Sequence, residues 1–195
     1  DAASFLFRGG STNQTARCRR RPLSGRIVGP LFSLEPHVSS ELLFDYSHVD
    51  FDAPMAGLDL IHRINPHRGH MVQLDGVAWW TEGLGVGWKD VRDDEFWVEG
   101  HIPGRPLYPG VLMVEASAQL SSFVIQIDKL EDPDRGFLGF VRSDETVFRS
   151  QVVPGDRLVI LAKMISNNRR RFVSKCQGFV GDNLVVETTV TGMRF

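Results

Sequence analysis

The sequence has few cysteines, almost no net charge and no long uninterrupted apolar run. Cys18 and Cys176 are the two cysteines among 195 residues, too few for a thiolate metal site or a secreted disulfide framework. A net charge of −2 argues against a nucleic-acid binder held by bulk positive charge. No apolar run approaches the roughly 20 residues of a spanning helix, so we expect no membrane insertion. These absences favour a soluble, cytoplasmic protein.

The composition otherwise predicts one globular domain preceded by an extension. Hydrophobic residues make up 42% of the chain and charged residues 24%, which excludes wholesale disorder. Residues 2–34 contain arginines but no Asp, Glu or Lys, and Ser, Thr and Gly fill the gaps. We expect residues 1–45 to form a basic, disordered extension, with an organelle-targeting peptide as the alternative. Residues 46–195 are then a single domain.

The pattern of apolar residues and turns predicts an α+β fold. A short helix over 58–64 ends before Pro66, because a residue preceding proline avoids the α region. The stretch 111–130 lacks internal Pro and Gly, and it predicts one long, largely buried helix. Strands are expected over residues 71–80, 84–88, 137–141, 146–148, 158–165, 171–180 and 184–192. There is no βαβ alternation, so we expect the sheet to pack against the long helix.

The segment 100–119 combines a stiff loop with the start of that helix. Pro103, Pro106 and Pro109 fix the backbone, so the loop can present His101 in one orientation. Gly110 lies where the helix begins, and the first N–H groups of a helix have no intrahelical partner. A ligand can approach the backbone closely there because glycine has no Cβ.

Glu115 lies five residues after Gly110, on a helix whose neighbouring side chains are mostly apolar. A buried acid is costly without a partner, and we expect burial to raise the pKa of Glu115. A lone Glu or a lone His is most often a structural residue satisfied by hydrogen bonds. The stiff loop, the free helix N-terminus and the costly acid occur together here, and that coincidence favours a catalytic site.

The same segment resembles the 3-hydroxyacyl-(acyl carrier protein) dehydratases of fatty-acid synthesis. Their signature is Gly-His-Phe-Pro, then Pro, then Pro-Gly-Val-Leu, then Glu-Ala and Ala-Gln, and Ile102 replaces its Phe. Residues 65–68 and 153–158 resemble two further parts of the family pattern, so the similarity covers roughly residues 58–193. The matching positions are His101, Pro103, Pro106, Pro109, Gly110, Val111, Leu112, Glu115, Ala116, Ala118 and Gln119.

The resemblance implies a hot-dog fold, in which an antiparallel sheet wraps one long central helix. It also implies a homodimer, often assembled into a trimer of dimers. The active site would lie at the dimer interface, with His101 from one subunit and Glu115 from the other. The substrate would arrive on acyl carrier protein.

The expected reaction is the dehydration of a 3-hydroxyacyl thioester to a trans-2-enoyl thioester. Neutral His101 would be the base, and the Gly110 N–H would hydrogen-bond the thioester oxygen. Glu115 would donate a proton to the leaving hydroxyl or hold the departing water. This chemistry needs no metal or organic cofactor. The alternatives are a hot-dog acyl thioesterase and a non-catalytic acyl-binding subunit.

Other candidate motifs are weaker. The glycines of residues 83–87 lack the spacing of a dinucleotide loop and predict a hairpin turn entering a strand. His67 and His70 have the spacing of a metal pair, but no further ligands cluster nearby, so unliganded loop histidines are favoured. There is no Gly-x-Ser-x-Gly, which argues against a serine hydrolase.

Overall fold

The computed structural model describes residues 41–195. Two α-helices, two short 3₁₀ helices and six strands follow one another along this part of the chain. They are α1 (Leu58–Ile64), η1 (Gly69–Met71), β1 (Gly76–Thr81), β2 (Leu84–Asp90), α2 (Gly110–Gln126), η2 (Ile127–Lys129), β3 (Leu138–Phe148), β4 (Arg157–Asn167), β5 (Arg171–Val180) and β6 (Asn183–Arg194).

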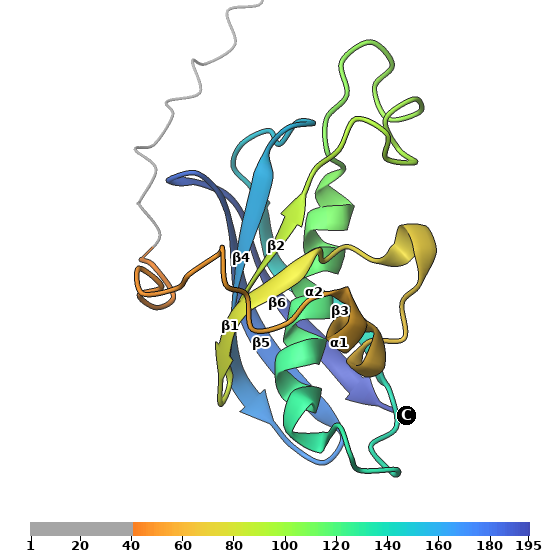
Figure 1. Ribbon diagram of the computed structural model, residues 1–195, viewed down its shortest axis with the longest axis vertical. Helices are drawn as coiled ribbons and strands as arrows, with labels where there is room; N and C mark the ends of the chain where they lie inside the picture. The colour runs from red at the N-terminus through yellow and green to blue at the C-terminus, as the bar shows by residue number, and fades with distance from the viewer. Residues whose placement is uncertain (1–40) are drawn as a thin grey trace, which may run out of the picture. The chain divides into compact units, whose positions relative to one another are not determined.

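The six strands form one antiparallel sheet in the order β1-β2-β4-β5-β6-β3. The sheet is strongly curved, and α2 runs along its concave side (Figure 1). This is the α+β hot-dog arrangement that the sequence predicts, with a sheet around one long helix. Strand β3 is the first strand after α2 in the chain but pairs only with β6, so it forms one edge of the sheet.

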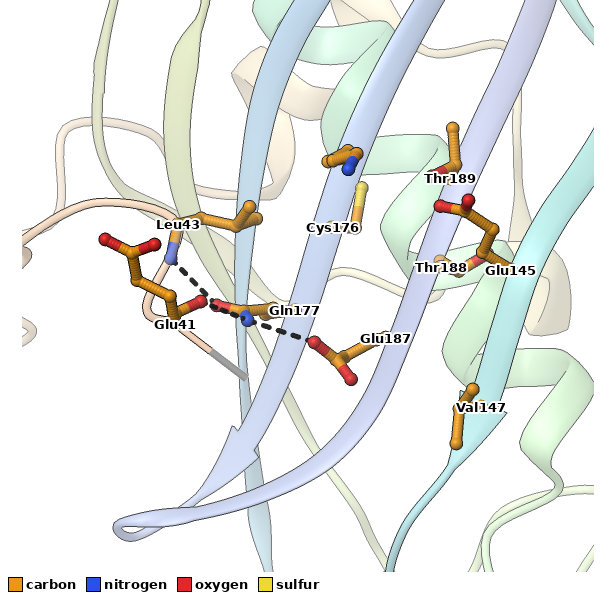
Figure 2. A pocket seen from close by; sticks show the side chains of 10 residues that line it. Glu41, Leu43, Glu145, Val147, Cys176, Gln177, Glu187, Thr188 and Thr189 are labelled. Atoms are coloured by element: carbon orange, nitrogen blue, oxygen red, sulfur yellow. Dashed lines mark hydrogen bonds between the residues drawn. The ribbon is translucent and has the colours of Figure 1, made fainter. Parts of the chain in front are cut away.

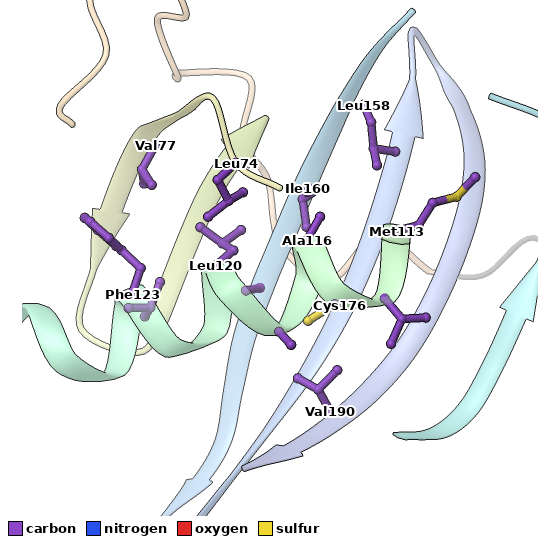
Figure 3. Close-up of a cluster of buried hydrophobic side chains, with 14 of the residues drawn as sticks. Leu74, Val77, Met113, Ala116, Leu120, Phe123, Leu158, Ile160, Cys176 and Val190 are labelled. Atoms are coloured by element: carbon purple, nitrogen blue, oxygen red, sulfur yellow. The ribbon is translucent and has the colours of Figure 1, made fainter. Parts of the chain in front are cut away.

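Helix α2 is the centre of the hydrophobic core. Leu120 and Phe123 are completely buried, and core side chains from β1, β4, β5 and β6 face the helix (Figure 3). Gly85 lies on the strand that passes beneath α2, where an added Cβ would come within 2.4 Å of Val124. The missing side chain lets the helix lie close to β2. Burial of each large side chain contributes about 1.5–3 kcal/mol.

The helical segment Gly110–Lys129 is long and apolar enough to cross a membrane by length and composition. The expectation that no segment reaches this length is therefore wrong. Most of the segment, 72%, is buried inside the protein, as in the core helix of a hot-dog sheet. Its apolar character is explained by burial on nearly all sides.

The convex face of the sheet is covered by the segment that precedes α1. Leu43, Phe44 and Phe51 pack there around Val86 and Leu161. The segment is tied to β5 by Gln177, whose Oε1 accepts from the Leu43 N–H at 3.0 Å (Figure 2). The expected domain starts at residue 46, yet residues 41–45 already lie on the folded sheet. The expected disorder of residues 1–40 lies outside the described residues.

Most predicted elements are present with bounds shifted by a few residues, and two differ in kind. Helix α1 and strand β5 have the predicted bounds, and Gly83 forms the predicted hairpin turn with φ +73°. The strand expected from residue 71 begins only at Gly76, because Gly69–Met71 is a 3₁₀ turn. The two strands expected before and after residue 145 are one strand, β3, interrupted by a bulge at Glu145 with φ +49°.

Candidate active site

His101 lies on the loop between β2 and α2, which rises above the first turn of the helix (Figure 1). The His101 N–H donates to the Trp97 carbonyl at 2.7 Å. At the other end of the loop, the Tyr108 N–H donates to the Val152 carbonyl at 2.8 Å. The loop is therefore anchored on both sides of Pro103 and Pro106, two of the prolines that stiffen it.

A backbone carbonyl fixes the tautomer of His101. Its Nδ1 lies 2.8 Å from the Leu107 carbonyl oxygen, which can only accept a hydrogen bond. Nδ1 therefore carries the proton, and Nε2 of the neutral ring keeps its lone pair. This is the form in which a histidine can remove a proton from a substrate.

The residue after His101 has an unusual backbone. Ile102 has φ +61°, which is rare for a β-branched side chain. Its carbonyl accepts from the Arg105 N–H at 3.0 Å, so the turn closes on itself. Such a conformation costs roughly 1–3 kcal/mol and is often found at functional sites.

The base of the loop is held by a buried ion cluster. Lys89 is 1% exposed, and its Nζ lies 2.6 Å from Glu95 and 3.2 Å from Asp75. Arg92 contacts the same two carboxylates from the solvent side. Removing one partner from a buried ion pair costs several kcal/mol. The cluster therefore fixes the direction in which the chain leaves β2 toward His101.

His101 and Gly110 line one pocket of about 370 Å³, so the structure brings these two predicted residues together. Gly110 is the first residue of α2, as predicted. An added Cβ at Gly110 would lie 2.8 Å from the ring of Phe148 on β3, so glycine keeps this wall of the pocket open. The start of α2, where the first N–H groups have no intrahelical acceptor, and the ring of His101 thus border the same space.

Glu115 lines a different cavity, of about 50 Å³, between α2 and the start of β3. Its Oε1 accepts from Gln119 Nε2 at 2.8 Å and lies 3.2 Å from His67 Nε2. Within one chain, therefore, the structure does not bring Glu115 to the pocket of His101.

The pKa of Glu115 is lowered, and the expected rise is wrong. Burial of the carboxyl raises the pKa, as the apolar helix suggests. The hydrogen bonds from His67 and Gln119, together with the electrostatic effect of His67, lower it by more. Gln119 lies one helical turn from Glu115, so the sequence alone suggests this donor. His67 comes from a loop that is distant in the sequence. Glu115 is thus an anion at neutral pH.

His67 is the residue that sequence reasoning missed. Its spacing from His70 suggests a metal pair, and the sequence favours unliganded loop histidines. In the structure the two rings have different partners. His67 contacts Glu115, whereas the ring centroids of His70 and Phe96 are 5.6 Å apart. The available signal was the segment 65–68, which forms part of the family resemblance.

Comparison with known protein families shows which family the chain belongs to. A model described as FabA-like domain matches residues 54–189, most of the chain. The chain belongs to the FabA-like domain family. The family suggested by the motif around His101 and Glu115 is thereby confirmed.

Curated relatives in this family carry the name FabZ. The chain is 36% identical over 132 residues to "3-hydroxyacyl-[acyl-carrier-protein] dehydratase FabZ" of Acinetobacter baumannii, covering 67% of this chain and 90% of that protein. It is 37% identical over 136 residues to "Bifunctional enzyme LpxC/FabZ" of Porphyromonas gingivalis, covering 69% of this chain. The match spans only 29% of that longer bifunctional protein, and 38% of its counterpart from Bacteroides thetaiotaomicron.

A solved structure supports the fold. "The Dehydratase Heterocomplex ApeI:P from Xenorhabdus doucetiae" aligns with a TM-score of 0.60 and 14% sequence identity. The alignment covers 69% of this chain and 90% of that one. At this identity the likeness concerns the fold alone.

Proposed function

We propose that the chain is a dehydratase that converts 3-hydroxyacyl thioesters on acyl carrier protein into trans-2-enoyl thioesters in fatty-acid synthesis. The observation that carries the proposal is the pocket shared by His101 and Gly110, in which an imidazole with a free Nε2 faces the start of a helix. The FabZ relatives carry this activity in their names, which supports the same reaction here.

The first part of the reaction is the removal of the α-proton. His101 Nε2 takes this proton while negative charge develops on the thioester oxygen. The Gly110 N–H, at the positive end of α2, hydrogen-bonds that oxygen. Loss of one such donor typically costs roughly 3–4 kcal/mol of transition-state stabilisation.

The second part is the departure of the hydroxyl group. An ionised Glu115 cannot donate a proton, but it can accept a hydrogen bond from the substrate 3-hydroxyl and orient it. The imidazolium of His101 then returns its proton to the leaving oxygen. The α-C–H and the C–O bonds break, the C=C bond forms and water leaves, so His101 ends the cycle neutral.

A homodimer would unite the two halves of the site. The edge strand β3 exposes a row of large apolar side chains, which a monomer would leave in water. The row consists of Phe140, Val141, Val147 and Phe148. Phe148 borders the pocket of His101 and Phe140 borders the cavity of Glu115. Pairing along β3 would bring Glu115 of one subunit toward His101 of the other, and a trimer of dimers would be a further assembly.

Incubation of the purified protein with 3-hydroxybutyryl and crotonyl acyl carrier protein tests the function. Mass spectrometry of the carrier protein should show interconversion by loss or gain of one water. Release of free acid would instead identify the thioesterase alternative. Unchanged substrate, with a FabZ enzyme as positive control, would identify a non-catalytic acyl-binding subunit.

A further inference from the structure

We propose that His67 is a positioning residue for Glu115: its Nε2–H holds the carboxylate in one orientation, as the anion that receives the substrate hydroxyl. This inference rests on the proposed function and adds a positioning residue to the proposed active site. The contact joins the loop after α1 to the second turn of α2, two segments far apart in the sequence.

The geometry around Glu115 leaves its carboxylate little freedom. The side chains of His67 and Glu115 are 25% and 19% exposed, so their 3.2 Å contact is largely shielded from water. The second donor, Gln119, is itself fixed, because its Nε2 also donates to the Met71 carbonyl at 2.7 Å. Its Oε1 accepts from the Gln73 N–H at 2.9 Å. Two anchored donors thus converge on one carboxylate oxygen.

The loop that carries His67 is tied down by the next residue. The guanidinium of Arg68 donates to the carbonyls of Asn65 at 2.9 Å and His62 at 2.8 Å. Asn65 is buried, and its Nδ2 donates to the Gln119 carbonyl on α2 at 2.9 Å. The ring of His67 is therefore placed by the same helix that carries Glu115.

The surroundings of the ring also determine which ring nitrogen carries the proton that faces Glu115. Glu115 can only accept, so Nε2 carries the proton that lies between them. Nδ1 is buried and has no hydrogen-bond partner within residues 41–195. The proton that faces Glu115 therefore lies on Nε2, whereas the fixed proton of His101 lies on Nδ1.

Removal of the His67 hydrogen bond should change the chemistry of Glu115. Burial raises the pKa of this carboxyl and the hydrogen bonds lower it, so loss of one donor shifts the pKa upward. A protonated Glu115 cannot accept the substrate hydroxyl in the same way. The acidic limb of the pH–rate profile should therefore move to higher pH when His67 is lost.

Two variants that differ by one methylene test the proposal. His67→Gln places an amide nitrogen where Nε2 lies, whereas His67→Asn is too short to reach the carboxylate. Each is compared with wild type by the pH dependence of kcat and by ¹³C NMR titration of glutamate-labelled protein, with Glu115→Gln identifying the Glu115 signal. We expect His67→Asn to raise the Glu115 midpoint, shift the acidic limb upward and lower kcat by about tenfold, the smaller effect typical of an orienting partner.

The Gln variant should retain the wild-type midpoint and most of kcat. A folded His67→Asn with an unchanged Glu115 midpoint overturns the proposal, as does loss of function in both variants alike. Nitrogen NMR of wild-type His67 needs no variant, and an unprotonated Nε2 at neutral pH would also overturn it. The titration does not depend on turnover. A shifted midpoint in a protein that never dehydrates substrate would therefore contradict the proposed function, while an active enzyme with an unshifted midpoint contradicts only the role of His67.

Discussion

Two histidine-bearing loops of this protein use the same ring in opposite ways. His101 donates a hydrogen bond from Nδ1 to a backbone carbonyl, and Nε2 of its neutral ring keeps a lone pair beside an open pocket. His67 Nε2 lies 3.2 Å from a carboxylate oxygen, and the buried Nδ1 of the same ring has no hydrogen-bond partner among residues 41–195. The partner decides the tautomer, and the tautomer decides whether a neutral histidine removes a proton or donates a hydrogen bond. His101 is thus suited to act on substrate and His67 to act on Glu115.

Removal of the His101 side chain should give the largest loss of dehydration activity. His101→Ala deletes the base, so we expect dehydration to fall by roughly 10²- to 10⁴-fold. The side chain is on a loop, so the melting temperature should stay within a few degrees of wild type. His70→Ala is the matched control, because the His70 ring lies against Phe96, and it should keep nearly full activity. Turnover within a few-fold of wild type for His101→Ala would remove His101 from the mechanism.

Glu115→Gln should give the second-largest loss of dehydration activity. The amide keeps the shape but loses the negative charge, and we expect turnover to fall by about 10²-fold, because a neutral amide oxygen accepts the hydrogen bond of the substrate hydroxyl more weakly than a carboxylate does. Because the pKa of Glu115 is lowered from 4.5 on folding, its ionisation adds stability above that pH, and the gain is lost as pH falls through the folded pKa. The wild type should therefore lose its advantage over Glu115→Gln upon acidification.

Chemical denaturation of both proteins between pH 7 and pH 3 measures this difference. If the stability advantage of wild type over Glu115→Gln grew on acidification, the direction of the pKa shift would be contradicted. Near-normal turnover of a stable Glu115→Gln would show that the acid is structural.

A methyl group at Gly110 should have an intermediate effect. In Gly110→Ala the Cβ would lie 2.8 Å from the Phe148 ring, which is half exposed and able to move. We expect only a small loss of stability, but about a tenfold loss of kcat/KM, because the methyl group crowds the wall where the thioester oxygen binds. Gly100→Ala is the control, since an added Cβ there meets nothing within 4 Å. Equal kinetics for the two variants would argue against substrate contact at Gly110.

The smallest effect concerns the strained residue beside His101. Asparagine tolerates a positive φ better than isoleucine, and Ile102 is 45% exposed, so little packing is lost on replacement. We expect Ile102→Asn to raise the free energy of unfolding by up to about 1 kcal/mol. Urea denaturation measures the change. A loss of more than that amount would mean that the Ile102 side chain packs more than its exposure suggests.

Local signals in the sequence were sufficient for much of the fold and for one half of the site. Proline and glycine spacing predicts the loop of His101 and the start of α2 at Gly110, because both depend on backbone constraints within a few residues. The strand β1 was predicted to begin too early. The Gln73 N–H bonds to the side chain of Gln119 instead of a neighbouring strand, and no local pattern reveals that partner.

The sequence could not predict the protonation state of Glu115, for a similar reason. Neighbouring apolar residues on the helix indicate desolvation, and desolvation alone would raise the pKa. The opposing hydrogen bond comes from His67, which a three-dimensional contact brings to the helix. Apolar periodicity therefore predicts that an acid is buried, but its charge depends on which donors the fold delivers.

The most direct test of the account is complementation between two inactive subunits. His101→Ala and Glu115→Gln chains are mixed, exchanged and assayed for dehydration of 3-hydroxybutyryl acyl carrier protein by mass spectrometry. If the site is shared, each mixed dimer contains one intact site, formed by His101 of one chain and Glu115 of the other. A random mixture should then recover about a quarter of wild-type activity, because half of the dimers are mixed and each has one of two sites. No recovery, with subunit exchange confirmed by native mass spectrometry, would contradict a site built from His101 and Glu115 of two subunits.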